Sequence, residues 1–215
     1  MDNATELERW NARFAGEDYF YGTEPNAFLV SQRGRLRPGR KALAVADGEG
    51  RNGVWLAEQG LGVVSVDFSP AALEKARRLA ARRGVAIETQ CDDLALWDWG
   101  PPRFDAVVGI FIQFAPPALR AKIFHHMQQV LKPGGLLLLE GYRPEQLDYK
   151  TGGPAQIENL YTAALLREAF SDLQILHLAE YDAEIAEGNG HRGMSALIDL
   201  VAQKRACIAP DMAGR

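Results

Sequence analysis

Short apolar runs alternate with segments of helical period through most of the chain. Helical segments, such as the one that Ser69 and Pro70 open and that Gly84 ends, separate the runs. The apolar runs predict strands at residues 42–46, 63–66, 85–91, 104–110 and 136–139. Strands and helices that alternate in this way build a doubly wound parallel α/β sheet, which binds ligands at the carboxyl ends of its strands.

The last third of the chain departs from this alternation. A helix is expected from about residue 159 to residue 170, followed by long strands over residues 173–185 and 194–203. The turn between these strands, residues 186–193, is short enough to join only antiparallel strands. We therefore expect a Rossmann-like seven-stranded sheet that is mostly parallel and ends in an antiparallel C-terminal hairpin.

The residues before the first strand form a separate N-terminal feature. Leu7, Trp10 and Phe14 recur at helical intervals, and Asn26 is placed to cap a second helix. An aromatic stretch, residues 19–21, lies between the two helices. We interpret residues 1–40 as lead-in helices that either pack against the sheet or cover a ligand as a lid. Residues 1–205 are expected to form one domain and residues 206–215 a flexible tail.

Composition narrows the class of protein. The 215 residues are 47% apolar and 24% charged, as is typical of a soluble globular domain. A net charge of −4 argues against nucleic acid as a partner. Cys91 and Cys207 are too few for a disulfide framework or a zinc site, so no metal is expected. The chain shows neither a signal-peptide pattern nor a membrane-spanning run, so we expect a cytoplasmic protein without a membrane partner; no oligomeric state is predicted.

The strand at residues 42–46 runs into a glycine-rich turn before a helix. Gly48 and Gly50 have no Cβ, which permits positive φ angles and close approach of a ligand to the backbone. The helix start adds unpaired N–H groups and a positive dipole end. The next strand ends in Asp67, and an acidic residue in this position can accept hydrogen bonds from both hydroxyls of a ribose. Together these features predict a nucleoside site.

The order of motifs resembles that of class I S-adenosylmethionine-dependent methyltransferases. The motifs are Gly50-Arg51-Asn52, Val66-Asp67, Cys91-Asp92-Asp93-Leu94, Phe104-Asp105 and Leu131-Lys132-Pro133-Gly134-Gly135. Residues 21–26, together with Glu187-Gly188 and His191, resemble the tellurite-resistance and thiopurine methyltransferase-like branch. The resemblance covers nearly the whole chain. It implies S-adenosylmethionine as cofactor and in-line methyl transfer to a small-molecule acceptor such as a thiol or a metalloid oxyanion.

The resemblance also implies which residues contact the cofactor. Asp67 would hold the ribose hydroxyls, and Asp93, or alternatively Asp92, would accept a hydrogen bond from the adenine amino group. Phe68 would flank the adenine, while Ile110 would pack on its other face or line the path of the methyl group. The complete set of expected cofactor contacts is Ala46, Asp47, Gly48, Gly50, Asp67, Phe68, Asp93, Leu94 and Ile110.

The glycine-rich turn departs from the superfamily pattern acidic-x-Gly-x-Gly-x-Gly. Aligning the last glycine on Gly50 puts Ala44 at the acidic position and Ala46 at the first glycine, with Asp47 three places after the acidic position. The other register, Gly48-x-Gly50-x-x-Gly53, matches the dinucleotide fingerprint. An NAD(P)-dependent oxidoreductase is therefore an alternative function, and a non-catalytic adenosylmethionine-binding protein is another.

Methyl transfer from a sulfonium needs few catalytic residues, because the protein has mainly to align the nucleophile and exclude water. His191 and Asp182 are candidate bases for an acceptor that must lose a proton. Residues 142–154 lack a helical or strand period, and a long irregular loop of this kind often covers a substrate. Acceptor contacts, with core packing as the alternative for each residue, are expected from Tyr21, Phe111, Gln113, Tyr142 and His191.

Overall fold

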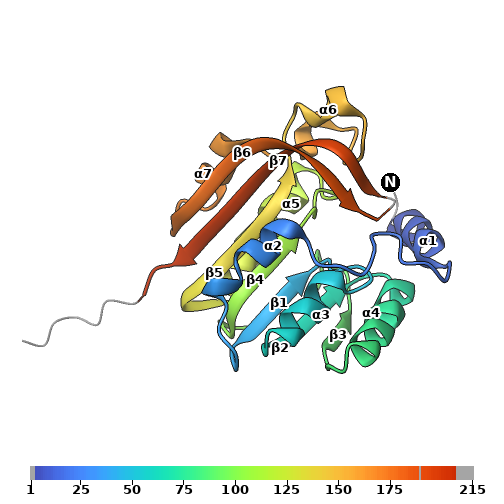
Figure 1. The fold of residues 1–215 in the computed structure, drawn as a ribbon. Coiled ribbons are helices and arrows are strands. Elements are labelled where there is room, and N and C mark those ends of the chain that lie inside the picture. The colour runs from blue at the N-terminus through green and yellow to red at the C-terminus, as the bar shows by residue number, and fades with distance from the viewer. Residues whose placement is uncertain (1–2, 189, 207–215) are drawn as a thin grey trace, which may run out of the picture.

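The computed structural model of the chain describes residues 3–188 and 190–206 and contains one seven-stranded sheet (Figure 1). The strands are β1 (Lys41–Val45), β2 (Gly62–Asp67), β3 (Glu88–Cys91), β4 (Phe104–Ile110), β5 (Leu131–Tyr142), β6 (Leu173–Glu187) and β7 (His191–Lys204). Their order across the sheet is β3-β2-β1-β4-β5-β7-β6. The first five strands are parallel, and β7 pairs antiparallel with both β5 and β6. The predicted fold class is confirmed.

Helices cover both faces of the sheet (Figure 1). They are α1 (Asn3–Phe14), α2 (Ala27–Ser31), α3 (Arg51–Glu58), α4 (Pro70–Arg82), α5 (Pro117–Gln129), α6 (Gln146–Tyr149) and α7 (Ala163–Ala169), with the short 3-10 helices η1 (Arg33–Arg35) and η2 (Ile157–Asn159). Successive strand residues point to opposite faces. Ala42 of β1 accordingly packs with Phe28 of α2 and Leu56 of α3, whereas the next residue, Leu43, joins the core with Met127 of α5.

Side-chain caps fix where the helices that flank the site begin. The Ser69 hydroxyl accepts a hydrogen bond from Ala72 N at 3.2 Å, and Pro70 occupies the first helical position of α4. Asn26 Oδ1 accepts from Leu29 N at 2.9 Å and starts α2. Both starts agree with the sequence analysis, because the cap residue itself carries the signal.

The terminal hairpin is tighter than its sequence suggests. The turn predicted at residues 186–193 is wrong, since β6 runs to Glu187 and β7 begins at His191, where the two residues pair. Strand pairing uses backbone groups, so polar side chains extend the ladder beyond the apolar pattern. Gly188 has a φ of 68°, which helps the chain to reverse within a few residues.

Other helices and strands begin at residues that differ from the predicted ones. The last helix begins at Ala163 rather than near residue 159, because Thr162 caps it by accepting from Leu165 N at 3.2 Å. The third strand begins at Glu88 rather than at residue 85. The fifth strand begins at Leu131 rather than at residue 136, with an irregular register opposite the start of β4. The loop over residues 142–154 contains the short helix α6.

Some expectations concern parts of the chain that the structure does not describe. Residues 207–215 of the predicted tail, with Cys207, lie outside the described residues. Among residues 3–188 and 190–206, no helix is long and apolar enough to cross a membrane.

Candidate functional site

The glycine-rich loop leaves the carboxyl end of β1 and leads directly into α3. Gly50 caps α3 with a φ of 87°, and a Cβ on it would come within 2.6 Å of Ala76 Cβ of α4. Glycine is thus required there by both the backbone and the packing. Gly48 has a φ of 57°, and Ala46, at the position of the first superfamily glycine, has a φ of 48°. The loop keeps a left-handed backbone at Ala46 although the residue there is no longer glycine.

Asp67, at the carboxyl end of β2, holds this loop in place. Its Oδ2 accepts a hydrogen bond from Gly48 N at 2.9 Å, and its Oδ1 accepts from Ser69 N at 2.9 Å. Burial raises the pKa of Asp67, whereas the backbone N–H groups oppose that shift. A carboxylate oxygen accepts more than one hydrogen bond, so Asp67 can bind hydroxyl groups while it holds the loop.

The carboxylate of Asp47 is turned beneath the start of α3. It accepts hydrogen bonds from Gly53 N at 3.1 and 3.2 Å and from Ser65 Oγ at 2.9 Å. A Cβ on Gly53 would overlap Asp47 Oδ2 and lie 3.6 Å from Ala44 Cβ. Asp47 therefore brings a carboxylate close to Ala44, the position where the superfamily pattern has its acidic residue. Burial raises the pKa of Asp47 to about 7.

The N-terminal segment packs onto the loop. Phe14 of α1 is 3% exposed, and its Cζ lies 3.8 Å from the point that a Cβ on Gly48 would occupy. Asn11 Oδ1 accepts a hydrogen bond from Ser69 Oγ at 2.6 Å, and Trp10 stacks on Phe14. The start of the chain thus covers the corner between β1 and β2. This arrangement is compatible with both interpretations of the lead-in helices, as packing against the sheet or as a lid over a ligand.

A buried ion pair fastens the strap, which we define as residues 15–26, to the glycine-rich loop. Lys75 Nζ lies 2.8 Å from Glu49 Oε1, and the two side chains are 8% and 1% exposed. Lys75 also donates to Asp18 O at 2.6 Å, and Tyr21 N donates to Glu49 Oε2 at 3.1 Å. Glu49, between the two glycines, therefore anchors the strap as part of the loop itself.

Four of the expected acceptor residues meet beside the loop. The Tyr21 ring stacks on His191 with 4.7 Å between ring centroids, and Phe111 stacks on His191 at 4.2 Å and on Tyr142 at 4.6 Å. The Tyr142 hydroxyl lies 2.6 Å from His191 Nδ1. We call Tyr21, Phe111, Tyr142 and His191 the aromatic cluster. Its members come from the strap, the end of β4, the end of β5 and the start of β7.

The aromatic cluster is uncharged at neutral pH. Burial lowers the pKa of His191 to about 3, and the charges of Arg51 and Arg13 act in the same direction. Burial also raises the pKa of both Tyr142 and Tyr21. The Tyr142 hydroxyl and His191 Nδ1 share one hydrogen bond between neutral groups, whose direction is set by the tautomer of the imidazole.

Gln113 and Asp182 have other surroundings. Gln113 Nε2 donates to Tyr142 O at 2.9 Å, and Gln113 Oε1 accepts from Tyr142 N at 2.6 Å, so this side chain fixes the backbone of the cluster. Asp182 forms an ion pair with Arg143 and accepts from the Tyr149 hydroxyl at 3.0 Å. The structure does not bring Asp182 together with the aromatic cluster.

The residues expected around an adenine follow the ends of β2, β3 and β4. Asp92 N donates to Asp67 O at 3.1 Å, which holds the ends of β2 and β3 together. Phe68 and Ile110 are partly exposed, whereas Leu94 is 6% exposed and packs into the main core. Asp93 Oδ1 accepts from Ala95 N within its own turn.

The sequence analysis missed a buried polar network between α3 and the hairpin. Arg51 Nη2 lies 2.6 Å from Glu187 Oε2, and Asn26 Nδ2 donates to Glu187 Oε1 at 3.0 Å and to Glu140 Oε1 at 2.5 Å. Burial and the neighbouring Asp199 carboxyl raise the pKa of Glu140. Only their positions in the sequence could have indicated these residues, because each of them lies near the end of an expected strand or the start of a helix.

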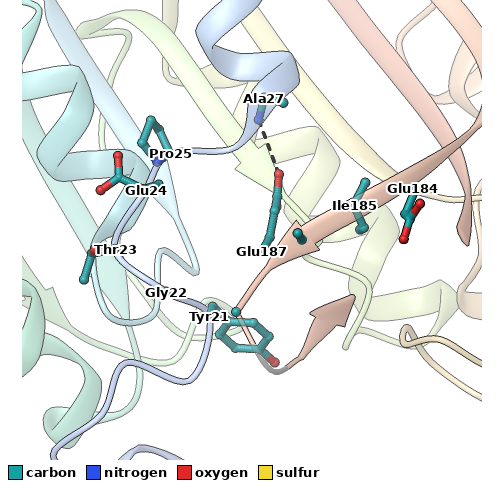
Figure 2. Close-up of a pocket in the computed structure, with 11 residues that line it drawn as sticks. Tyr21, Gly22, Thr23, Glu24, Pro25, Ala27, Glu184, Ile185 and Glu187 are labelled. Atoms are coloured by element: carbon teal, nitrogen blue, oxygen red, sulfur yellow. Dashed lines mark hydrogen bonds between the residues drawn. The ribbon is translucent and has the colours of Figure 1, made fainter. Parts of the chain in front are cut away.

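Within the described residues, cavities open on the surface at both ends of the parallel strands. The first, of about 320 Å³, lies between the strap and the end of β6 (Figure 2). Figure 2 shows Glu187 pointing across it toward Ala27, whose N–H donates to Glu187 Oε1 at 3.3 Å. The second, of about 580 Å³, lies at the other end of the strands, where β1, β4 and β5 begin, and is lined in part by Arg35, Arg37 and Arg40. Within the described residues, no group of three or more His, Cys, Asp or Glu side chains is arranged to hold a metal ion.

Residues 42–135 match the family model described as a methyltransferase domain. An uncharacterized methyltransferase of Synechocystis sp. (strain PCC 6803) is 32% identical over 111 residues, which are 51% of this chain and 50% of that protein. The chain spans about half the length, or less, of the curated relatives that it matches. The matched segment contains the glycine-rich loop and Asp67, whereas Tyr21, Tyr142 and His191 lie outside it.

Solved structures share the fold over nearly the whole chain. TehB from Haemophilus influenzae has a TM-score of 0.70 at 18% identity, over 93% of this chain and 67% of that one. The N-methyltransferase NodS from Bradyrhizobium japonicum has a TM-score of 0.65 at 14% identity, over 95% of this chain and 98% of that one. At these identities the likeness concerns the fold.

Proposed function

We propose that this chain is a class I S-adenosylmethionine-dependent methyltransferase and transfers a methyl group from S-adenosylmethionine to a small-molecule acceptor. One observation carries the proposal. The Asp67 carboxylate is fixed between Gly48 N and Ser69 N at the point where the left-handed loop meets the tip of β2. A carboxylate beside a left-handed glycine loop suits the hydroxyls of a nucleoside.

The groups at this corner fit a nucleoside that carries an amino acid. Asp67 offers acceptors for ribose hydroxyls, and Gly48 lets a ligand approach the backbone. Arg51, at the start of α3, is buried and has a guanidinium nitrogen without a hydrogen-bond partner among the described residues. Phe68 and Ile110 remain partly exposed at the ends of β2 and β4, the two strands that flank β1, and we place the adenine between them. When bound, S-adenosylmethionine supplies a methyl group on a sulfonium, which is already a good leaving group.

The aromatic cluster suits a small acceptor that is already a nucleophile when it binds. The rings of Tyr21, Phe111 and Tyr142 would form the apolar walls of the acceptor site, which orient a small molecule and exclude water. Burial lowers the pKa of His191 to about 3, so this ring is a weak base at neutral pH, and we assign it to lining the acceptor site. A thiolate, a metalloid oxyanion or an unprotonated amine needs no stronger base.

Activity against a panel of acceptors tests the proposal. The full chain is incubated with S-adenosylmethionine and, in separate reactions, with thiols, selenite, tellurite and small amines, and the release of S-adenosylhomocysteine is measured. We expect release above the acceptor-free rate with at least one acceptor. Binding of S-adenosylmethionine without release for any acceptor would instead support a non-catalytic binding protein.

The dinucleotide alternative loses its main support. Gly53, the last glycine of that register, is needed because Asp47 fills the space beside it. The sheet also carries β7 antiparallel between β5 and β6, whereas the dinucleotide fold continues with a sixth parallel strand. Both observations favour methyl transfer over hydride transfer.

A further inference from the structure

Arg51 is a buried cation with an unused hydrogen-bonding group. It is the first residue of α3, directly after Gly50, and it is 6% exposed. Its Nη2 is bound by Glu187 Oε2 at 2.6 Å, whereas its buried Nη1 has no hydrogen-bond partner within the described part of the chain. Leaving a buried charged donor unsatisfied destabilises a fold, and buried polar groups are almost always hydrogen-bonded, so this nitrogen points to a ligand.

Arg51 connects the two halves of the site: it follows Gly50 of the loop, and its ion-pair partner Glu187 pairs with His191 of the aromatic cluster across the hairpin. Burial is the main cause of the shifted pKa of Asp47, in the loop, and of His191 and Tyr142, in the aromatic cluster. The charge of Arg51 lowers the pKa of all three groups: it adds to the shift of His191 and opposes the shifts of Asp47 and Tyr142, so it is within electrostatic range of both halves. A donor in this position faces the region where the amino-acid end of a bound nucleoside would meet the acceptor.

Glu187 holds Arg51 in a fixed orientation. One Glu187 oxygen binds Arg51 Nη2, and the other accepts from Asn26 Nδ2 at 3.0 Å and from Ala27 N at 3.3 Å (Figure 2). The carboxylate is therefore anchored to the start of α2. A guanidinium held at one nitrogen can present its other nitrogens to a second anion with little loss of conformational entropy.

The other charged groups of the loop are already engaged. Asp47 binds Gly53 N and Ser65, and Glu49 forms its ion pair with Lys75. Both are acids, so Arg51 is the cation of this stretch, residues 47–53. An amino-acid end carries a carboxylate, which a guanidinium binds with matched geometry.

We propose that Nη1 of Arg51 binds the carboxylate at the amino-acid end of the cofactor, with Glu187 as the residue that positions it. This inference rests on the proposed function. The superfamily pattern has an acidic residue where this chain has Ala44. The contact of Arg51 would give the loop a different side chain for the amino-acid end of the cofactor.

Two ligands that differ in their amino-acid end test the contact. S-adenosylhomocysteine and 5′-methylthioadenosine share the nucleoside and the thioether sulfur, but 5′-methylthioadenosine has no carboxylate. Titration calorimetry on the full chain compares the wild type with Arg51→Met. We expect the substitution to weaken S-adenosylhomocysteine by about tenfold or more and 5′-methylthioadenosine by no more than about twofold. Equal weakening of both ligands, or unchanged affinity for S-adenosylhomocysteine, would overturn the proposal.

Three further variants sharpen the result. Arg51→Lys keeps the charge but loses the fork geometry, so its affinity for S-adenosylhomocysteine should be intermediate. Glu187→Gln should lower the same affinity by less than Arg51→Met, since it loosens the arginine without removing it. Arg143→Met is the matched control, because Arg143 also binds a carboxylate, that of Asp182, but outside the loop. It should leave both affinities unchanged.

The wild-type titration separates the two proposals. If the wild type binds neither S-adenosylhomocysteine nor 5′-methylthioadenosine, the proposed function fails, and this inference fails with it. If the wild type binds both and Arg51→Met leaves their affinity ratio unchanged, only the role of Arg51 is wrong. Retained binding of 5′-methylthioadenosine by the variant shows in the same experiment that its site is folded.

Discussion

Gly53 lacks a side chain because the Asp47 carboxylate occupies the adjacent space. The same carboxylate accepts from Gly53 N and from the Ser65 hydroxyl and lies close to Ala44. An alanine at position 44 is thus matched by an aspartate three residues later. At the scale of single residues, the loop has no acidic side chain at position 44, but the Asp47 carboxylate reaches the space beside Ala44 from a backbone position three residues later.

The dependence of Gly53 on Asp47 can be measured. Gly53→Ala should lower the free energy of unfolding by about 1 to 3 kcal/mol, because the added methyl overlaps Asp47 Oδ2. Urea unfolding of Gly53→Ala in the wild type and in an Asp47→Ser background provides the comparison. The shorter serine should reduce the cost. An equal cost in both backgrounds would show that Asp47 is not what excludes a side chain at residue 53.

Asp67 should be needed for cofactor affinity. Asp67→Ala removes charge-assisted hydrogen bonds worth ~1.5 to 3 kcal/mol, so the dissociation constant for S-adenosylmethionine should rise by about tenfold or more. Equilibrium binding by tryptophan fluorescence measures the change. Asp105→Ala is the control, because Asp105 also accepts a backbone N–H, from Lys41, but at the opposite end of the strands. Unchanged affinity in Asp67→Ala would remove this residue from the site.

The stability of the chain should depend on pH through His191. The folded pKa of about 3 lies below the usual histidine value of about 6.5, so between these values only the unfolded chain binds a proton at this ring. The contribution of His191 to stability is therefore complete above about pH 6.5 and is lost as the pH falls toward 3. His191→Gln should lack this dependence.

Urea unfolding at pH 5 and pH 7.5 tests this dependence. The stability advantage of the wild type over His191→Gln should shrink by about 2 kcal/mol at the lower pH. Groups that both proteins share cancel in the difference, including Asp47, whose raised pKa gives a stability that falls as the pH rises toward 7. An advantage that is the same at both pH values would mean that His191 is not held neutral by the fold.

The residues that sequence could place are those with a local signal. Gly50 and Asp67 each follow a strand, and the chemistry of glycine and of a carboxylate at a strand end is readable from one stretch of sequence. Arg51 and Glu187 could not be paired in this way, because they are far apart in the chain and meet only through the hairpin. The orientation of Asp47 likewise depends on Ser65 of the neighbouring strand.

At the scale of elements, a buried ion pair fastens the middle of the strap to the loop. Lys75→Met would leave Glu49 charged and unpaired and would remove the bond from Lys75 to Asp18 O. We expect faster hydrogen exchange across residues 16–22, while amides of the central strands β1 and β4 stay protected. Glu74→Gln, which breaks exposed ion pairs on the same helix, is the control. Unchanged exchange in the strap of Lys75→Met would show that other contacts hold it.

Element types were easier to predict than their ends. The parallel strands β1, β2 and β4 are apolar runs whose side chains are buried, so their composition marks them. The hairpin extends past its apolar pattern, since Glu187 and His191 pair through backbone groups that no side-chain period reveals. The helix α6 is four residues long, too short to show a helical period.

At the scale of the whole molecule, the two halves of the site come from different parts of the chain. The glycine-rich loop and Asp67 lie within residues 42–135, the segment that matches the methyltransferase domain. The aromatic cluster draws Tyr21 from the strap, Tyr142 from the end of β5 and His191 from the hairpin. Sequence reasoning selected these residues from their places at strand ends and in loops, but their mutual stacking follows only from the assembled fold.

The most direct test of the central claim is titration calorimetry of the full-length wild type with S-adenosylhomocysteine, in the presence and in the absence of NADH. We predict one binding site per chain for S-adenosylhomocysteine and an affinity that NADH does not change. Failure of S-adenosylhomocysteine to bind, or its displacement by NADH, would contradict the assignment of the loop and Asp67 to an adenosylmethionine site.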